Sequence, residues 1–153
     1  MKKILILALI VVLALPLFAQ GKERIYGNWY NGKKVAKLEI YPLRDGTISG
    51  KIIWLKEPLT ADGKAKTDAK NPDVKLRNVP MIGLNILSGL VYDGKGKYSK
   101  GKIYDPESGK SYSAKAEMVD NNTLALRGFI GISLAGRTET WTRAIEKDEK
   151  QAE

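Results

Sequence analysis

Carboxylates are the main candidates for chemistry in this sequence, because histidine and cysteine are both absent. Their absence excludes Ser-His-Asp and Cys-His nucleophilic sites. It also excludes the usual zinc ligand sets, haem held through histidine, and iron–sulfur clusters. Glu39, Glu117 and Glu139 fall on segments with strand-like patterns. A buried pair of carboxylates can act as acid and base, but no spacing here defines such a pair. We therefore expect no enzyme and no catalytic residues.

A second group of acids lies in the polar stretch TADGKAKTDAKNPD. Its oxygen-bearing side chains, Asp62, Asp68, Asn71 and Asp73, do not follow the spacing of a calcium-binding loop, and lysines stand between them. No glycine-rich phosphate-binding loop of the required form occurs. The sequence therefore predicts no metal site and no cofactor.

The segment GRTETWTR carries the most informative pattern. Strand alternation places Arg137, Glu139, Trp141 and Arg143 on one face and the threonines on the other. If the first face points inward, an aromatic ring with charged neighbours lies at one end of the interior. In the alternative interpretation, Glu139 pairs with an arginine and Trp141 only closes one end of the fold, where a stacked arginine would stabilise it.

The elements that must position these residues are strands. Turn signals such as RDG, DPESGK and DNN recur at short intervals and separate segments rich in Ile, Val, Thr, Tyr and Trp. Alternation in SYSAKAEM indicates sheets with one polar face. Hairpins in series favour an all-β, antiparallel up-and-down barrel, which leaves no free edge. The predicted strands are 24–31, 34–43, 47–56, 81–92, 97–104, 110–119, 123–133 and 136–143.

One connection, from Lys56 to Val79, is much longer than the others. Loops beyond about 12–15 residues are usually functional or disordered. Near its end, Asn71 is a candidate cap, Pro72 suits a first helical position, and Asp73 favours a helix start, so one short helical turn is predicted before the fourth strand. The apolar run PMIGLNILSGL that follows is either barrel core or the rim of a cavity covered by the loop.

The N-terminal segment indicates export. Residues 1–19 combine two lysines, an apolar run and a small residue, Ala19, as in a secretory signal peptide. The run is shorter than the roughly 18 residues that a spanning helix needs, and no later segment would span a bilayer. We expect one domain over 20–143, a polar tail over 144–153, and an exported protein that is periplasmic or secreted.

The chain is basic, with a formal net charge of +9. Its lysines are scattered and are not grouped around aromatic residues, which argues against binding to nucleic acid. A basic exported protein can instead meet an anionic surface of the cell envelope.

A family resemblance rests on specific segments. YGNWY, from Tyr26 to Tyr30, resembles the Gly-x-Trp motif of lipocalins, in which a late arginine packs across the tryptophan; Arg143, or else Arg137, would take that part here. The fuller set resembles the family called domain of unknown function 2147, small exported bacterial proteins with a lipocalin-like barrel. Tyr98 stands where that family leads us to expect tryptophan. The segments are GNWY, GKIIWL, KNPDVKLRNVPMIGLNIL, GKIYDPESGKSYSAKAEM and LRGFIGISLAGRTETWTR.

The resemblance implies a calycin-like barrel with an internal cavity, closed structurally by Gly27, Trp29 and Arg143. Trp141, from the alternation described above, is also counted among the closing residues. We expect a small hydrophobic or amphiphilic ligand, such as a lipid or fatty acid, because an eight-stranded barrel holds side chains or one small ligand. The predicted cavity wall is Trp54, Leu84, Ile86, Ile103, Leu126 and Ile130, with Arg77 and Arg127 at the mouth to anchor an acidic head group. The alternative is a non-catalytic envelope protein with a packed barrel and a basic surface for anionic lipid or glycan. The sequence leaves the oligomeric state open.

Overall fold

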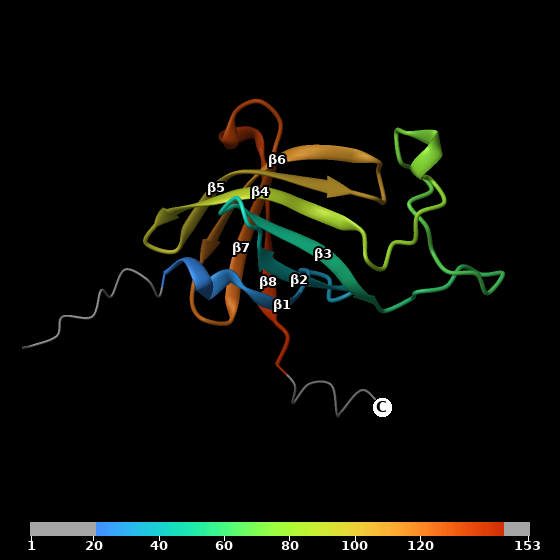
Figure 1. Ribbon diagram of the computed structural model, residues 1–153, viewed down its shortest axis with the longest axis horizontal. Coiled ribbons are helices and arrows are strands. Elements are labelled where there is room, and N and C mark those ends of the chain that lie inside the picture. Colours follow the sequence, from blue (N-terminus) through green and yellow to red (C-terminus); the bar gives the residue numbers. More distant parts are fainter. Residues whose placement is uncertain (1–20, 146–153) are drawn as a thin grey trace, which may run out of the picture.

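The structure, a computed structural model, describes residues 21–145 (Figure 1). The signal peptide predicted over 1–19 and the tail beyond Ile145 lie outside the described residues. Within 21–145, no helix is both long enough and apolar enough to cross a membrane.

Eight antiparallel strands form a closed barrel in which each strand pairs with the next along the chain. The first and last strands pair through Trp29 with Arg143 and Tyr30 with Thr142, which closes the sheet. The predicted all-β, up-and-down barrel is therefore confirmed. The strands are β1 (Gly27–Tyr30), β2 (Ala36–Pro42), β3 (Ile48–Leu55), β4 (Asn85–Gly94), β5 (Lys97–Asp105), β6 (Lys110–Met118), β7 (Thr123–Phe129) and β8 (Arg137–Arg143).

Three strand predictions were too long by three or more residues at one end. The first strand was predicted from residue 24, but the 3-10 helix η2 (Lys22–Ile25) precedes β1. The fourth was predicted from residue 81, but Gly83 has a φ of +93° and belongs to a turn before β4. The seventh was predicted to residue 133, but β7 ends at Phe129, and the 3-10 helix η4 (Ser133–Ala135) lies in the connection to β8. In each case apolar residues continue past the last ladder pair, so composition alone extends the strand.

The predicted helical turn before β4 is present as the 3-10 helix η3 (Val74–Leu76). Its N-cap is Asp73, whose side chain accepts a hydrogen bond from the backbone N–H of Lys75. Asn71, the cap that the sequence suggested, instead accepts from the N–H of Asp73 and so shapes the turn one step earlier. Both acceptor side chains satisfy backbone donors that a helix start leaves unpaired.

One end of the barrel is closed by an arginine stacked on a tryptophan. The Arg143 guanidinium carbon lies 4.1 Å from the centre of the Trp29 ring, and Trp29 Nε1 donates to the carbonyl oxygen of Ile25 at 2.8 Å. Gly27 has a φ of +113°, and a Cβ there would lie 3.2 Å from Arg143 Nη1. Of the two arginines that the sequence suggested, Arg143 therefore takes the closing position, while Arg137 is exposed.

The β3–β4 loop, residues 56–84, extends away from the barrel beyond the other end (Figure 1). A buried carboxylate, Asp68, fixes its middle section: it accepts from Tyr104 Oη at 2.7 Å and from Asn71 Nδ2 at 2.6 Å. Burial, followed by the hydrogen bond to Asp68, raises the pKa of Tyr104 to about 12. The loop is thus fastened to β5 through side chains rather than through the ladder.

Candidate ligand-binding cavity

A cavity of about 500 Å³ opens at the end of the barrel opposite the Trp29–Arg143 closure. This volume lies within the roughly 300–1,000 Å³ typical of small-molecule sites. Trp141 is buried and contributes its ring to the lining. The apolar lining consists of Val35, Ala36, Leu38, Ile52, Leu55, Met81, Ile86, Ile103, Pro106 and Trp141.

A β-bulge decides which side chains of β3 face this cavity. Leu38 is opposite Ile52, but Lys37 is opposite Trp54, so one extra residue is inserted in β3 between these pairs. A bulge reverses the inside–outside alternation beyond it. Consequently Ile52 and Leu55 are buried and line the cavity, whereas Trp54 is 38% exposed.

Glu139 introduces a carboxylate into this mainly apolar lining. It lies on β8, two residues before Trp141, and its Oε2 accepts from Trp141 Nε1 at 2.7 Å. Within the described residues, Oε1 of Glu139 has no ion-pair partner. This oxygen is available to a hydrogen-bond donor on a ligand.

The turn between β1 and β2 is shaped around the same carboxylate. A Cβ on Gly32 would lie only 2.6 Å from Glu139 Cγ and 3.0 Å from its Oε1. Glycine at position 32 therefore allows the turn backbone to pass close to Glu139. The carboxylate is held from two sides, by the Trp141 indole and by this turn.

Charged side chains surround the mouth and balance in sign. The lysines are Lys33, Lys56 and Lys66, and the acids besides Glu139 are Glu57 and Glu107. Lys66 Nζ lies 3.5 Å from Glu57 Oε2, an ion pair within the β3–β4 loop. Lys66 and Met81 come from this loop, so the loop forms part of the rim, while Figure 1 shows much of the loop extending away from the barrel.

Among the residues predicted to form the cavity wall, Ile86 and Ile103 line the cavity. Leu126 is buried in the barrel core, opposite Glu139 across the β7–β8 pair. Leu84 is half-buried just before β4, where its carbonyl oxygen accepts from the N–H of Ile52. Neither Leu126 nor Leu84 contributes to the lining.

The other four predicted residues lie outside the cavity. Trp54 packs its ring edge-to-face against Tyr30 on the outer surface, because the bulge in β3 turns its side chain outward. Ile130 follows the end of β7 and is 70% exposed. Arg77 is exposed and donates from Nε to the carbonyl of Asn71.

Arg127 has the opposite parity to Leu126 on β7, so it faces outward while Leu126 faces inward. It donates to the carbonyl oxygens of Ser133 and Leu134 and to Thr138 Oγ1. The two predicted anchors for an acidic head group, Arg77 and Arg127, are therefore not at the mouth.

Sequence reasoning did not assign Glu139 and Trp141 to the cavity itself, nor Leu38, Ile52 and Leu55. The alternation in GRTETWTR already placed Glu139 and Trp141 on one face, and this was the signal that could have identified them. No comparable signal marked the β3 bulge. Within residues 21–145, no group of three or more acids is placed to hold a metal ion.

Comparisons with known proteins agree with this geometry. The family model described as "Uncharacterized protein conserved in bacteria", domain of unknown function 2147, matches residues 27–143. A solved structure, protein HP1028 from Helicobacter pylori, described as belonging to the lipocalin family, is similar with a TM-score of 0.70 and 28% sequence identity. The match covers 82% of this chain and 86% of that one. No curated protein sequence matches this chain significantly.

Proposed function

The chain belongs to the bacterial family called domain of unknown function 2147, and we propose that it binds a small, partly apolar ligand in the cavity of its barrel. The observation that carries this proposal is the cavity of about 500 Å³, whose apolar wall holds the carboxylate of Glu139 beside the Trp141 indole. A packed barrel acting only through its surface would not need this space. The lipocalin-like fold is compatible with such binding, although fold alone does not define function.

Glu139 also restricts the kind of ligand. An apolar chain that covered the carboxylate without giving it a hydrogen-bond donor would bury an unpaired charge, which is strongly unfavourable. A fatty acid, with no donor and a negative charge, therefore fits this position poorly. We propose an amphiphile whose hydroxyl or amino group reaches Glu139 Oε1 and whose apolar part contacts Leu38, Ile52 and Ile103.

The proposed role is binding rather than catalysis. Acid–base catalysis needs two groups near the reacting atoms. The other acids of the lining, Glu57 and Glu107, stand on exposed loops, and Glu57 pairs with Lys66. We also propose that the protein acts after export, on the pattern of residues 1–19; fractionation of cells that express the full chain tests this.

Tryptophan fluorescence tests the binding proposal, because Trp141 lines the cavity. The purified protein is titrated with dodecylamine, dodecanol and dodecanoate. We expect the amine and the alcohol to bind more tightly than the carboxylate. The proposal for this ligand class would be refuted if none of the three compounds changed the tryptophan emission. It would also be refuted if no compound could displace another from the protein.

Two variants locate the binding. Ala36→Phe places a ring in the mouth and should weaken binding of all ligands, provided that its thermal melting shows a folded protein. Glu139→Gln keeps an acceptor for Trp141 Nε1 but removes the charge, so it should weaken the amine about tenfold, which corresponds to one charge-assisted hydrogen bond. Equal effects of Glu139→Gln on amine and carboxylate would contradict the assigned role of Glu139.

A further inference from the structure

Three large apolar side chains are displayed together on the β7–β8 loop, residues 130–136. Ile130, Ile132 and Leu134 are 70%, 69% and 89% exposed. Single exposed apolar residues are ordinary, but a cluster on one short loop marks a surface that contacts a partner or a membrane. The loop projects above the strands in Figure 1.

The loop is held in a defined shape. Arg127 reaches from β7 into the loop, where its Nε donates to the carbonyl of Ser133 at 2.8 Å and its Nη2 to that of Leu134 at 3.0 Å. Its Nη1 donates to Thr138 Oγ1 at 2.8 Å, on the neighbouring strand. Gly136 lets the loop backbone pass close to β7, because a Cβ there would lie 2.6 Å from the carbonyl oxygen of Gly128. The apolar side chains are therefore exposed by a fixed backbone.

A basic groove leads to this loop over the outer face of β5, β6 and β7. Its cationic residues are Lys97, Lys100, Lys102, Lys115 and Arg127, against the acids Asp93 and Glu117. The strand registers place Lys102 opposite Ser113, and Ser113 opposite Phe129, the last residue before the loop. Lys115 lies opposite Arg127, and its Nζ lies 5.6 Å from the centre of the Phe129 ring. Positive charge thus extends to the base of the apolar loop.

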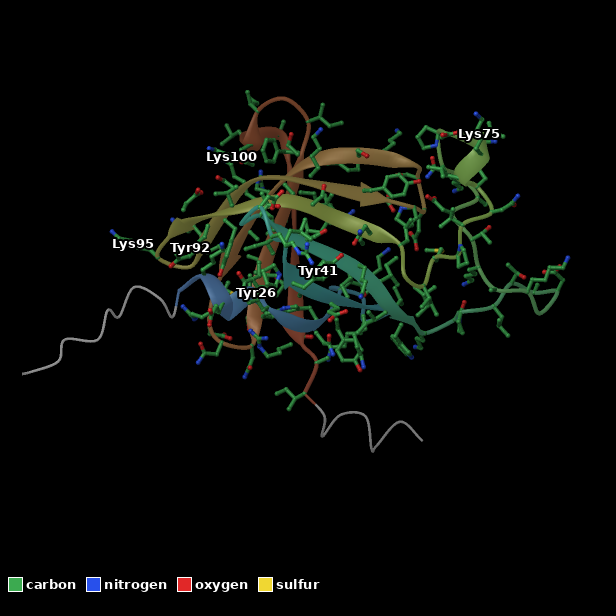
Figure 2. The ribbon with its side chains drawn as sticks, viewed as in Figure 1. Tyr26, Tyr41, Lys75, Tyr92, Lys95 and Lys100 are labelled. Carbon is green, nitrogen blue, oxygen red and sulfur yellow. The ribbon has the colours of Figure 1, made fainter. Side chains whose placement is uncertain are left out.

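The backbone at Lys100 adds a separate observation. Lys100 lies within β5 at a register irregularity and has a φ of +60°. A lysine in the left-handed region costs about 1 kcal/mol relative to glycine. The side chain is among those that line the groove, and its position is labelled in Figure 2.

From these features we propose that the β7–β8 loop and the basic groove dock the protein on an anionic lipid bilayer. Apolar side chains entering the acyl boundary, flanked by Lys and Arg near the head groups, are the combination by which proteins bind membrane surfaces. An anionic polysaccharide would match the groove but would leave Ile132 and Leu134 exposed to water. A second copy of this chain would bring one basic groove against another.

The β7–β8 loop and the basic groove include none of the cavity residues, but docking through them affects where the cavity mouth lies. In an up-and-down barrel the β1–β2, β3–β4, β5–β6 and β7–β8 connections lie at one end. The cavity opens at this end, since its lining includes residues of the first three connections. Docking through the β7–β8 loop brings the cavity mouth near the bilayer.

Vesicle flotation tests the docking. The protein is mixed with vesicles of phosphatidylcholine, with or without phosphatidylglycerol, at low and high salt. We expect flotation with the anionic vesicles, weaker flotation with the neutral ones, and a loss at high salt because exposed charges are screened. The double variant Ile132→Ser/Leu134→Ser should lower the partition coefficient at least about tenfold, because it removes most of the exposed apolar area of the loop.

Matched controls separate this site from general stickiness. Val119 is 63% exposed in the turn between β6 and β7, at the other end of the barrel, so Val119→Ser should leave flotation unchanged. Lys100→Glu should weaken binding to anionic vesicles about tenfold or more, since it replaces a favourable charge with an unfavourable one. Lys75→Glu, the same charge change on η3 away from the groove (Figure 2), should have little effect.

Three results would overturn the proposal. The first is that the wild-type protein does not float with anionic vesicles. The second is that Ile132→Ser/Leu134→Ser binds as the wild type does, or that Val119→Ser and Lys75→Glu weaken binding as much as the site variants. The third is a wild-type dimer in solution that the loop variant abolishes, which would make the loop an interface between copies. If the wild-type protein floated with anionic vesicles but bound no ligand in the cavity, the proposed function would be refuted and the membrane docking would still hold.

Discussion

Replacing Arg143 should destabilise the barrel far more than replacing the exposed Arg137 on the same strand. The Arg143 guanidinium stacks on Trp29 and donates to the carbonyls of Asn121, Tyr26 and Arg24. Arg143 is half-buried, and its burial lowers the pKa of the guanidinium below its usual value. Part of the strength of these interactions therefore comes from exclusion of water.

The loss of stability expected for Arg143→Ala follows from these contacts. The bonds to the part-buried carbonyls of Tyr26 and Arg24 contribute about 1.5 kcal/mol each, as hydrogen bonds from a charged donor do. Stacking on Trp29 adds about 1 kcal/mol. Water can replace the third bond, to the exposed carbonyl of Asn121. Arg143→Ala should therefore lower the free energy of unfolding by about 4 kcal/mol, a large part of the roughly 5–15 kcal/mol typical of a domain.

Urea denaturation followed by tryptophan fluorescence measures this loss, because Trp29 and Trp141 are both buried. With a slope of about 1.5 kcal/mol per molar urea, the midpoint should fall by about 2 to 3 M. Arg143→Lys keeps the charge but not the planar guanidinium, so it should lower the free energy of unfolding by about half as much. This variant provides the test if Arg143→Ala does not fold.

Arg137→Ala is the control and should change stability by less than about 0.5 kcal/mol, because Arg137 is exposed. A free energy of unfolding for Arg143→Ala within about 1 kcal/mol of the wild type would refute the closing role assigned to this residue.

Two further predictions concern pH and packing. Burial, and then the charge on Tyr92, raises the pKa of Tyr98 from 10.0 to about 12. Because the hydroxyl ionises more easily in the unfolded chain, the contribution of neutral Tyr98 to stability is present below pH 10 and is lost as pH rises from 10 toward 12. Tyr98→Phe should therefore flatten the fall in the free energy of unfolding over this range, measured by urea titration. An unchanged slope in Tyr98→Phe would contradict this prediction. Gly109 and Gly63 have similar φ values of +72° and +79°, but only at Gly109 would a Cβ meet a backbone atom, the Lys70 carbonyl oxygen at 2.1 Å. Gly63→Ala should therefore lower the free energy of unfolding by about 1 kcal/mol, because of the positive φ alone. Gly109→Ala should lower it by at least about 1 kcal/mol more, because of the clash with Lys70. Equal urea midpoints for the two variants would show that the β5–β6 turn does not pack against the β3–β4 loop.

The sequence by itself determined the architecture, because strand length, alternation and turn chemistry are local properties. DPESGK and DNN end one strand and begin another wherever they occur, so the order of the eight strands could be read along the chain. It also indicated the closure, since Gly27, Trp29 and Arg143 occupy positions whose likeness to lipocalins could be recognised without coordinates.

Only the tertiary structure decided which side chains enter the cavity. Along an ideal strand, Ile52 and Trp54 share a face, but the bulge against β2 turns Trp54 outward and Leu55 inward. A bulge depends on how two strands pair, so neither strand's sequence reveals it. Arg127 shows a different limit: its outward parity was readable from Leu126, yet its bonds to the β7–β8 loop depend on a backbone that folds back over β7.

The environment of the Glu139 carboxylate, which has no ion-pair partner within the described part of the chain, depends in the same way on tertiary contacts. Alternation placed Glu139 beside Trp141, but it left open whether an arginine would neutralise the carboxylate. In the folded chain Arg143 is engaged at the closed end, while the Trp141 indole and the Gly32 turn hold the carboxylate in the cavity. The chain's local patterns fixed a barrel of eight strands, and the long-range pairing of those strands placed the Glu139 carboxylate in the cavity without an ion-pair partner among residues 21–145.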